Sequence, residues 1–262
     1  MLRALRTASL GMYAQSLRVD NIANNLANTN TTGFKKGRIE FQDLFYETLR
    51  PAGVSDQQNT QLPTELQIGH GSRPVANIKN FMQGEIVQTE NTLDMAMEGV
   101  GFFQVTKPDG NIAYTRDGNF HMSSDGQLVT ASGLSLQPAI SIPEDAIEIN
   151  IGVDGIVSVV FSGDPTPQEV GQIELAKFVN PGGLKNVGGN LFEATSASGD
   201  PLLGNPGVEG FGKLLQGYLE KSNVNVVNEM VGLIVAQRAF EVNSKAIRTA
   251  EQMMEIANGI KR

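Results

Sequence analysis

Both ends of the chain carry a hydrophobic repeat of helical period. Within residues 2–27 the repeat consists of Leu5, Met12, Val19 and Leu26 at seven-residue spacing, with Ile22 widening the stripe. Within residues 225–258, apolar and small positions alternate at spacings of three and four, the a/d signature of a coiled-coil seam. The large residues of that seam are Leu233, Phe240, Ile247 and Met254. The pattern therefore predicts one long helix at each end.

Prolines are confined to the middle of the chain. All 11 lie between Pro51 and Pro206, and only five of the 29 glycines lie outside residues 51–218. Because proline and glycine interrupt helices, their distribution leaves both ends free to be helical.

The two helices carry more apolar surface than one contact between them can cover. The simplest interpretation is an intramolecular helical hairpin. Further apolar residues lie off the main stripes, however, at Leu2, Leu10, Leu17, Met230, Ile234, Met253 and Ile260. A single partner helix cannot cover several faces of another helix. We therefore favour terminal helices that pair with each other and also pack against copies of themselves.

The middle of the chain has the pattern of short strands. Asp-Gly pairs at residues 109–110, 117–118, 125–126 and 154–155 separate short apolar runs, and each pair is a hairpin signal. About eight strands in a small barrel or sandwich are expected. The fold class is therefore α+β, with the N- and C-terminal helices paired as a coiled-coil-like core and a mainly antiparallel β domain inserted between them.

Four ranges follow from this organisation. Residues 1–34 form the N-terminal helix of a discontinuous inner core, and residues 217–262 form its C-terminal helix. Residues 35–80 form a connecting arm, either a short helix or an extended segment, with a long loop from Pro51 to Leu66. Residues 81–216 form the outer β domain.

An asparagine-rich stretch marks the end of the first helix. It comprises Asn24, Asn25, Asn28 and Asn30, followed by Gly33 and Phe34. Asparagine is a mediocre helix former because its side chain competes for nearby backbone groups. We therefore expect these amides to hydrogen-bond between subunits, and we expect Gly33 to be the point where the chain leaves the helical core.

Charge and composition exclude several classes of function. The net charge is −8, and because both ends are slightly basic the acidic charge lies in the middle. An acidic surface argues against nucleic acid and anionic membranes as partners. No apolar run approaches the roughly 18 residues of a membrane span, so no membrane insertion is expected. A cleaved secretory signal is not expected either.

Catalytic and ligand-binding patterns are equally missing from the sequence. The chain has no cysteine and two histidines, His70 and His121, without other ligands at metal spacing. Neither the G-x-G-x-x-G pattern nor the G-x-S-x-G pattern occurs. The Asp-Gly carboxylates are best explained as turn formers. We therefore nominate no catalytic, cofactor-binding or metal-binding residue, expect no cofactor, and do not expect an enzyme.

Five motifs in order along the chain resemble those of the bacterial flagellar rod and hook (axial) protein family. They lie at residues 24–35, 93–105, 114–120, 126–133 and 220–245. Within that family, the chain length and the segments 51–66 and 62–74 are most similar to the distal rod type of the basal body.

The resemblance implies a structural role. Subunits of this kind form a hollow, rigid helical tube that transmits torque and encloses the export channel, with the helices inside and the β domain outside. The implied partners are copies of the chain, proximal rod subunits, hook subunits, the P-ring and L-ring proteins and the flagellar type III export apparatus. The implied location is the basal body, where the rod crosses the periplasm to the outer membrane.

The resemblance also implies that one loop stiffens the tube. The residues assigned to it are Pro51, Gly53, Gln58, Leu62, Pro63 and Leu66. Two alternatives stay open: a proximal rod or short hook subunit of the same family, and a secreted coiled-coil adhesin with a β head. We also expect the terminal helices to be largely disordered before assembly, because they lack partners there.

Overall fold

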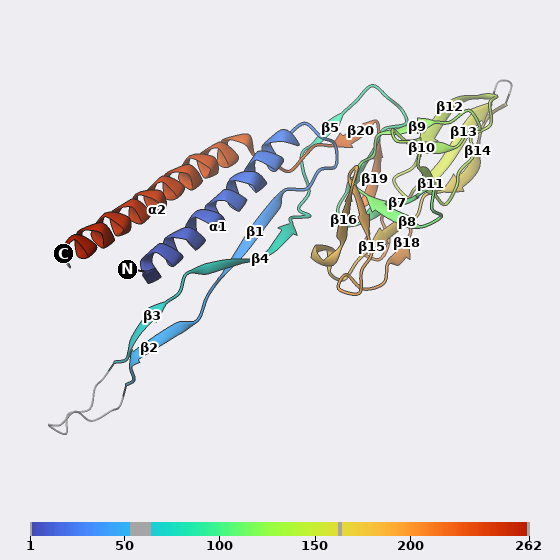
Figure 1. The fold of residues 1–262 in the computed structure, drawn as a ribbon. Helices are drawn as coiled ribbons and strands as arrows, with labels where there is room; N and C mark the ends of the chain where they lie inside the picture. Colours follow the sequence, from blue (N-terminus) through green and yellow to red (C-terminus); the bar gives the residue numbers. More distant parts are fainter. Residues whose placement is uncertain (1, 53–63, 162–163, 261–262) are drawn as a thin grey trace. The chain divides into compact units, whose positions relative to one another are not determined.

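The computed structural model describes residues 2–52, 64–161 and 164–260. Contacts within the chain divide it into two compact units, which we describe separately (Figure 1). The helical unit contains Met1–Leu26, Gly37–Ile78 and Asn225–Arg262. The β unit contains Ala27–Lys36 and Lys79–Val224.

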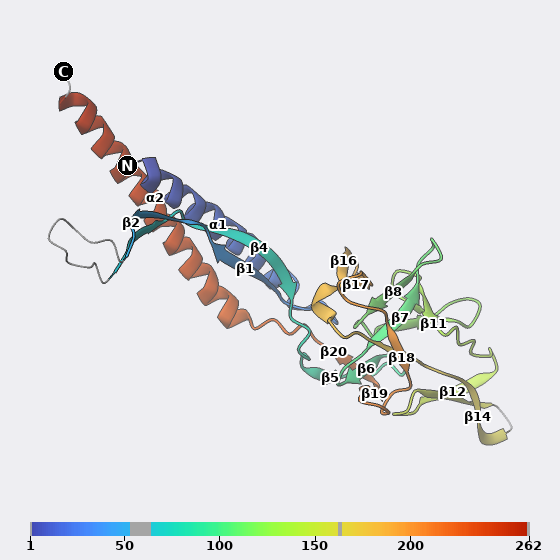
Figure 2. The ribbon, with the colours of Figure 1, turned by 90° about the horizontal axis from the view of Figure 1, so that it is seen from below.

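Two long helices dominate the helical unit. Helix α1 spans Leu2–Ala27 and helix α2 spans Val226–Ile260. Asn225 caps α2, because its Oδ1 accepts a hydrogen bond from the backbone N–H of Asn228 at 3.0 Å. The two helices lie side by side and antiparallel in both views (Figures 1 and 2). The predicted ranges 2–27 and 225–258 are confirmed to within two residues.

A long two-stranded ribbon completes the helical unit. Strand β1 (Gly37–Asp43) pairs with β4 (Ser72–Lys79), and β2 (Tyr46–Arg50) pairs with β3 (Leu66–Gly69). Backbone hydrogen bonds from Leu44 to Gly71 and from His70 to Phe45 join the two pairs. An ion pair of 2.8 Å between Arg3 and Glu47 ties the ribbon to α1. The connecting arm is therefore extended rather than helical.

The β unit is built from short antiparallel strands. Those before the middle of the unit are β5 (Ile86–Gln88), β6 (Met95–Glu98), β7 (Phe102–Thr106), β8 (Ile112–Thr115), β9 (Phe120–Met122), β10 (Leu128–Thr130), β11 (Ser135–Gln137) and β12 (Ala146–Ile151). Those after it are β13 (Ile156–Phe161), β14 (Asp164–Gln172), β15 (Leu175–Lys177), β16 (Lys185–Gly188), β17 (Leu191–Glu193), β18 (Leu202–Gly204), β19 (Lys213–Gln216) and β20 (Tyr218–Glu220), with a 3-10 turn at Pro181–Gly183.

Four sheets result from these pairings. The largest runs β16-β17-β8-β7-β11-β10-β9, and β15 joins it at β7 and carries β18. The others are β12-β13-β14, β19-β6 and β20-β5. Sequential hairpins across the predicted turns at residues 109–110, 125–126 and 154–155 account for three of the pairings.

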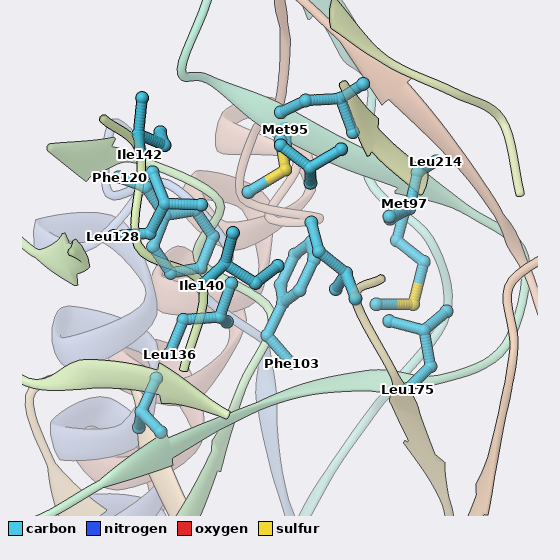
Figure 3. Close-up of a cluster of buried hydrophobic side chains, with 14 of the residues drawn as sticks. Met95, Met97, Phe103, Phe120, Leu128, Leu136, Ile140, Ile142, Leu175 and Leu214 are labelled. Carbon is cyan, nitrogen blue, oxygen red and sulfur yellow. The ribbon is translucent and has the colours of Figure 1, made fainter. Parts of the chain in front are cut away.

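Strand β7 is buried on both faces. Phe103 points into a main core together with Met95, Met97, Phe120, Leu128, Leu136, Ile140, Ile142, Leu175 and Leu214 (Figure 3). Phe102, its neighbour in sequence, points into a second, aromatic cluster with Tyr114, Ala176, Phe178 and Phe192. Because successive side chains of a strand alternate between faces, one strand links both cores.

The α+β class predicted from the sequence is confirmed at the level of two terminal helices and an inserted, mostly antiparallel β region. One turn prediction is wrong. Strands β8 and β9 are not neighbours, so Asp117-Gly118 does not close a hairpin between them. A Cβ added to Gly118 would lie 1.6 Å from the carbonyl oxygen of Met95, so close packing against β6 decides the path of the chain here.

The two units also divide the chain differently from the predicted ranges. Residues 27–34 and 217–224, expected to belong to the terminal helices, lie in the β unit. The reason is local pairing: β20 pairs with β5, and the backbone N–H of Gly33 donates to the carbonyl oxygen of Glu220 at 2.8 Å.

Candidate assembly site

Three side-chain contacts hold α1 against α2. The Nδ2 of Asn25 donates to Oε2 of Glu229 at 3.2 Å. A Cβ added to Gly232 would lie 3.4 Å from Cδ1 of Ile22, and one added to Gly11 would lie 2.8 Å from Nδ2 of Asn243. The residue numbers fall along α1 as they rise along α2, so the contact is antiparallel. Only the contact at Gly11 depends on glycine, because a Cβ there would lie too close to Asn243, whereas a Cβ at Gly232 would be at an ordinary contact distance from Ile22.

The predicted core residues differ in how far the chain itself covers them. Ile22 is buried, as are the small seam residues Ala236 and Ala250. The half-covered members are Leu5, Met12, Val19, Leu26, Leu233, Ile247 and Met254. Phe240 is 43% exposed and lines a groove between the helices with Val19, Asp20 and Glu241. The seam is therefore only partly closed within one subunit.

The outer face of α2 is apolar and exposed. Its exposed apolar residues are Val227, Met230, Val231, Ile234, Val235, Val242, Met253 and Ile256. We call this set the outer face of α2. Scattered apolar side chains are normal on a protein surface, but a row of them along one helix, here interrupted between Val242 and Met253 by polar residues such as Lys245 and Thr249, marks an interaction site. This row includes Met230, Ile234 and Met253, which the sequence placed off the seam.

The asparagines of this stretch differ in burial: one is buried and others are exposed. Asn25 is only 1% exposed, and it exchanges two hydrogen bonds with the backbone of Gly37, at 3.0 Å as donor and 2.9 Å as acceptor. Asn21 also donates to the Gly37 carbonyl, at 2.8 Å. The expectation that these amides bond between subunits is therefore wrong for Asn25, which stabilises the start of the ribbon. Asn24 and Asn30 are exposed.

The turn after α1 is part of the β unit. Asn28 accepts two hydrogen bonds from Thr31, one at its side chain and one at its carbonyl. Gly33 has a φ of +66°, and a Cβ there would lie 2.6 Å from the backbone nitrogen of Asp117. Phe34 is buried beneath the Lys79 ammonium, which lies 4.3 Å from its ring centroid. Both the positive φ and the close packing against Asp117 therefore require glycine at position 33.

A buried ionic cluster follows directly. The Lys35 ammonium lies 2.6 Å from Oε1 of Glu220, with the two side chains 0% and 1% exposed. Arg116, 4% exposed at its side chain, approaches Oε2 of Glu220 at 3.6 Å. Burial lowers the pKa of Lys35 and of Arg116, and in each case Glu220 opposes that shift. The backbone N–H of Gly84 also donates to Glu220, at 2.7 Å.

Sequence reasoning missed this cluster. Lys35 and Glu220 are 185 residues apart, and no local spacing rule joins them. The available signal was their position: each lies inside a stretch that carries the family resemblance, and so does Arg116.

Most of the predicted stiffening loop cannot be placed. Gly53, Gln58, Leu62 and Pro63 lie outside the described residues. Pro51 and Leu66, on either side, are exposed, and the flanking strands β2 and β3 pair with each other. Among the described residues there is no cluster of side chains suited to a metal ion, and no helix long and apolar enough to cross a membrane.

Three family models match the chain. The model for flagella basal body rod proteins matches residues 5–35. The model for the D1 domain of the flagellar hook protein FlgE/F/G matches residues 96–159. The model for the C-terminal part of the flagellar basal body rod FlgEFG proteins matches residues 215–260. These matches cover most of both terminal helices and the part of the β unit from residue 96 to residue 159.

Similar proteins match along nearly the whole length. The flagellar basal-body rod protein FlgG of Borreliella burgdorferi is 50% identical, and the alignment covers 100% of both chains. FlgG of Buchnera aphidicola subsp. Schizaphis graminum is 49% identical over 97% of this chain and 98% of its own. FlgG of Caulobacter vibrioides is 48% identical over 99% and 100%. The chain therefore belongs to the family of flagellar basal-body rod proteins of the FlgG type.

Proposed function

We propose that this rod subunit polymerises with copies of itself into a hollow, rigid helical tube that transmits torque and encloses the export channel. The observation that carries the proposal is the outer face of α2. Its apolar side chains have no cover within the described part of the chain, although the same residue types are fully buried in the β unit.

The helices supply the energy of assembly. Covering one large apolar side chain is worth roughly 1.5–3 kcal/mol. Several such contacts per subunit, repeated along a helical array, give a stiff polymer without any single strong bond. In this proposal α1 and α2 form a coiled-coil-like inner core, whose seam closes around Phe240 when neighbouring subunits add their own side chains.

The remaining partners follow from the position of a rod. We propose that the subunit meets proximal rod subunits below and hook subunits above, and turns within the P-ring and L-ring proteins between the periplasm and the outer membrane. It reaches that place through the flagellar type III export apparatus. Its role is structural, and we assign it no catalytic step.

Electron microscopy of the concentrated protein tests the proposal. Straight, hollow tubes are expected. Curved tubes would instead indicate a hook-like subunit, and dimers or trimers of fixed size would indicate an adhesin-like module. Absence of any polymer in the concentrated protein would contradict the proposal.

We also propose that the segment 51–66 braces neighbouring subunits. Its support is the pairing of β2 with β3, in which Arg50 lies opposite Leu66, so that the two ends of the segment lie side by side and Pro51 and Leu66 are exposed. Deletion of residues 53–63 is expected to leave polymerisation intact and to reduce the bending stiffness of the tubes. Unchanged persistence length in electron micrographs would remove the bracing role.

A further inference from the structure

The chain passes between its two units at four peptide links. They follow Leu26, Lys36, Ile78 and Val224. A subunit that transmits torque must carry load through these links. Within the β unit the links bound three segments, residues 27–36, the segment beginning at Lys79 and the segment ending at Val224, and the side chains of Asn223 and Glu220 in the last segment each hydrogen-bond to both of the others.

Asn223 joins three of these segments. Its Oδ1 accepts from the backbone N–H of Lys36 at 2.8 Å. Its Nδ2 donates to the carbonyl oxygens of Asn80 at 2.8 Å and Met82 at 2.9 Å. Lys36 is the last residue of the segment 27–36, and Asn80 and Met82 lie near the start of the segment that begins at Lys79. The backbone N–H of Asn80 also donates to the carbonyl of Lys36, at 2.8 Å.

Glu220 joins the same segments from the buried side. Its carboxylate holds the Lys35 ammonium and the N–H of Gly84, while its carbonyl accepts from Gly33. Lys35 in turn donates to the carbonyl of Met82 at 2.9 Å. Charge-assisted hydrogen bonds away from water are stronger than neutral, exposed ones, so this side of the arrangement resists opening.

We propose that Asn223 and Glu220 connect the links into one load-sharing junction. These side chains pass force that enters any one of the three segments, residues 27–36, the segment beginning at Lys79 or the segment ending at Val224, to the other two. Both are positioning residues for a mechanical function. The arrangement differs from ordinary sheet pairing because single side chains bridge passages that are otherwise far apart in sequence. The inference rests on the proposed function in one respect: torque transmission is the source of the force that the junction carries.

Single-molecule force spectroscopy of the full chain, pulled from its two ends, tests this junction. Load then enters the β unit at Ala27 and Val224 and must cross the Lys36–Asn223 and Gly33–Glu220 hydrogen bonds. Asn223→Ala is expected to lower the force of the first unfolding event of the β unit. Asn111→Ala, at an exposed position beside the β7–β8 turn, is the control for the substitution itself.

Ile173→Val is the control for stability. It removes one buried methyl group from the main core, outside the set of junction residues, at a cost similar to that of a lost hydrogen bond. The two variants are compared at an equal loss of melting temperature. The junction is supported if Asn223→Ala lowers the force of the first unfolding event and Ile173→Val does not. Equal forces for the two variants, or an unchanged force in Asn223→Ala, would overturn it.

Hydrogen exchange gives a second readout on the same proteins. In Asn223→Ala the amide of Lys36 is expected to exchange about fivefold faster or more, the factor that one ordinary hydrogen bond provides. An unchanged rate at Lys36 would also overturn the junction. Neither measurement uses a polymer, so these results are independent of whether the protein forms tubes.

Discussion

The helical unit and the β unit differ in how far their own chain covers their apolar side chains. In the β unit Phe103, Val157 and Leu175 have no measurable exposure, and the core is closed by residues of the same chain. In the helical unit Val242 is 68% exposed and Ile234 is 57% exposed. Both sets are ordinary apolar residues. The main core of the β unit is closed within one chain, whereas in our proposal the helical unit is completed by other copies.

The difference lies in geometry rather than composition. Strands of a folded sheet bury apolar side chains on one or both faces, as β7 does. A pair of helices can bury only one stripe of each helix against the other. Long helices with apolar residues on several faces therefore need further neighbours, and a polymer supplies them.

The largest predicted effect comes from placing negative charge on the outer face of α2. Val231→Asp combined with Ile234→Asp is expected to remove about 3–6 kcal/mol from subunit addition, because two apolar contacts of the outer face are lost. The critical concentration should then rise by roughly 100-fold or more, measured by sedimentation. Val153→Asp, an exposed apolar position in the β unit, is the control. If the double variant polymerised like the wild type, the outer face of α2 would not be a contact surface between subunits.

The next effect concerns the β unit alone. Lys35→Met leaves the buried Glu220 carboxylate without its ammonium partner. Loss of one partner of a buried pair typically costs about 3–5 kcal/mol. Chemical denaturation of the variant, followed by a β-sheet signal, should show this loss. Lys185→Met, which removes an exposed partner of Glu193 in the same unit, should change stability by less than about 1 kcal/mol. Similar losses in both would show that the cluster is not buried in solution.

Two glycine substitutions should act in opposite directions. Gly118→Ala places a Cβ against the Met95 carbonyl and is expected to destabilise the β unit by about 1–3 kcal/mol. Gly232→Ala lies within α2 at an ordinary contact distance from Ile22, and it should stabilise the helix by about 1 kcal/mol through helix propensity. Thermal unfolding by circular dichroism measures both. A stabilising Gly118→Ala would contradict the close approach.

The smallest effect is a pH dependence. Burial lowers the pKa of Lys79 below 10.5, so between the two values the unfolded chain binds more protons than the folded one. Stability contributed by this group therefore rises with pH in that window. Lys79→Gln should flatten the rise in unfolding free energy on the way to pH 10.5. An identical pH profile in the variant would show that the Lys79 ammonium is not desolvated.

The sequence predicted the elements that depend on local period. Helix α1 and helix α2 follow from apolar repeats and from the absence of proline, and three hairpins follow from Asp-Gly turns. The failures have long-range causes. Residues 38–49 have adjacent apolar pairs such as Leu44 and Phe45, which fit neither a helical nor an alternating period, and only pairing with β3 and β4 makes them strands.

The candidate site was predicted unevenly for the same reason. The stripe residues follow from helical spacing, and Ile22 is buried as expected. The fate of Asn25 could not be read from its neighbours, because its partners are Gly37 and Glu229. The Lys35–Glu220 cluster needs two segments that only the folded β unit brings together. Local periodicity therefore predicts surfaces, while buried polar contacts require the fold.

In our proposal the helical unit is completed by other copies, whereas the main core of the β unit is closed within one chain. Hydrogen exchange of the dilute monomer and of the polymer tests it most directly, with the amides of residues 227–242 in α2 compared with those of β7. For the monomer, fast exchange in α2 and slow exchange in β7 are expected, and for the polymer slow exchange in both. Protection of α2 in the dilute monomer equal to that of β7 would contradict it.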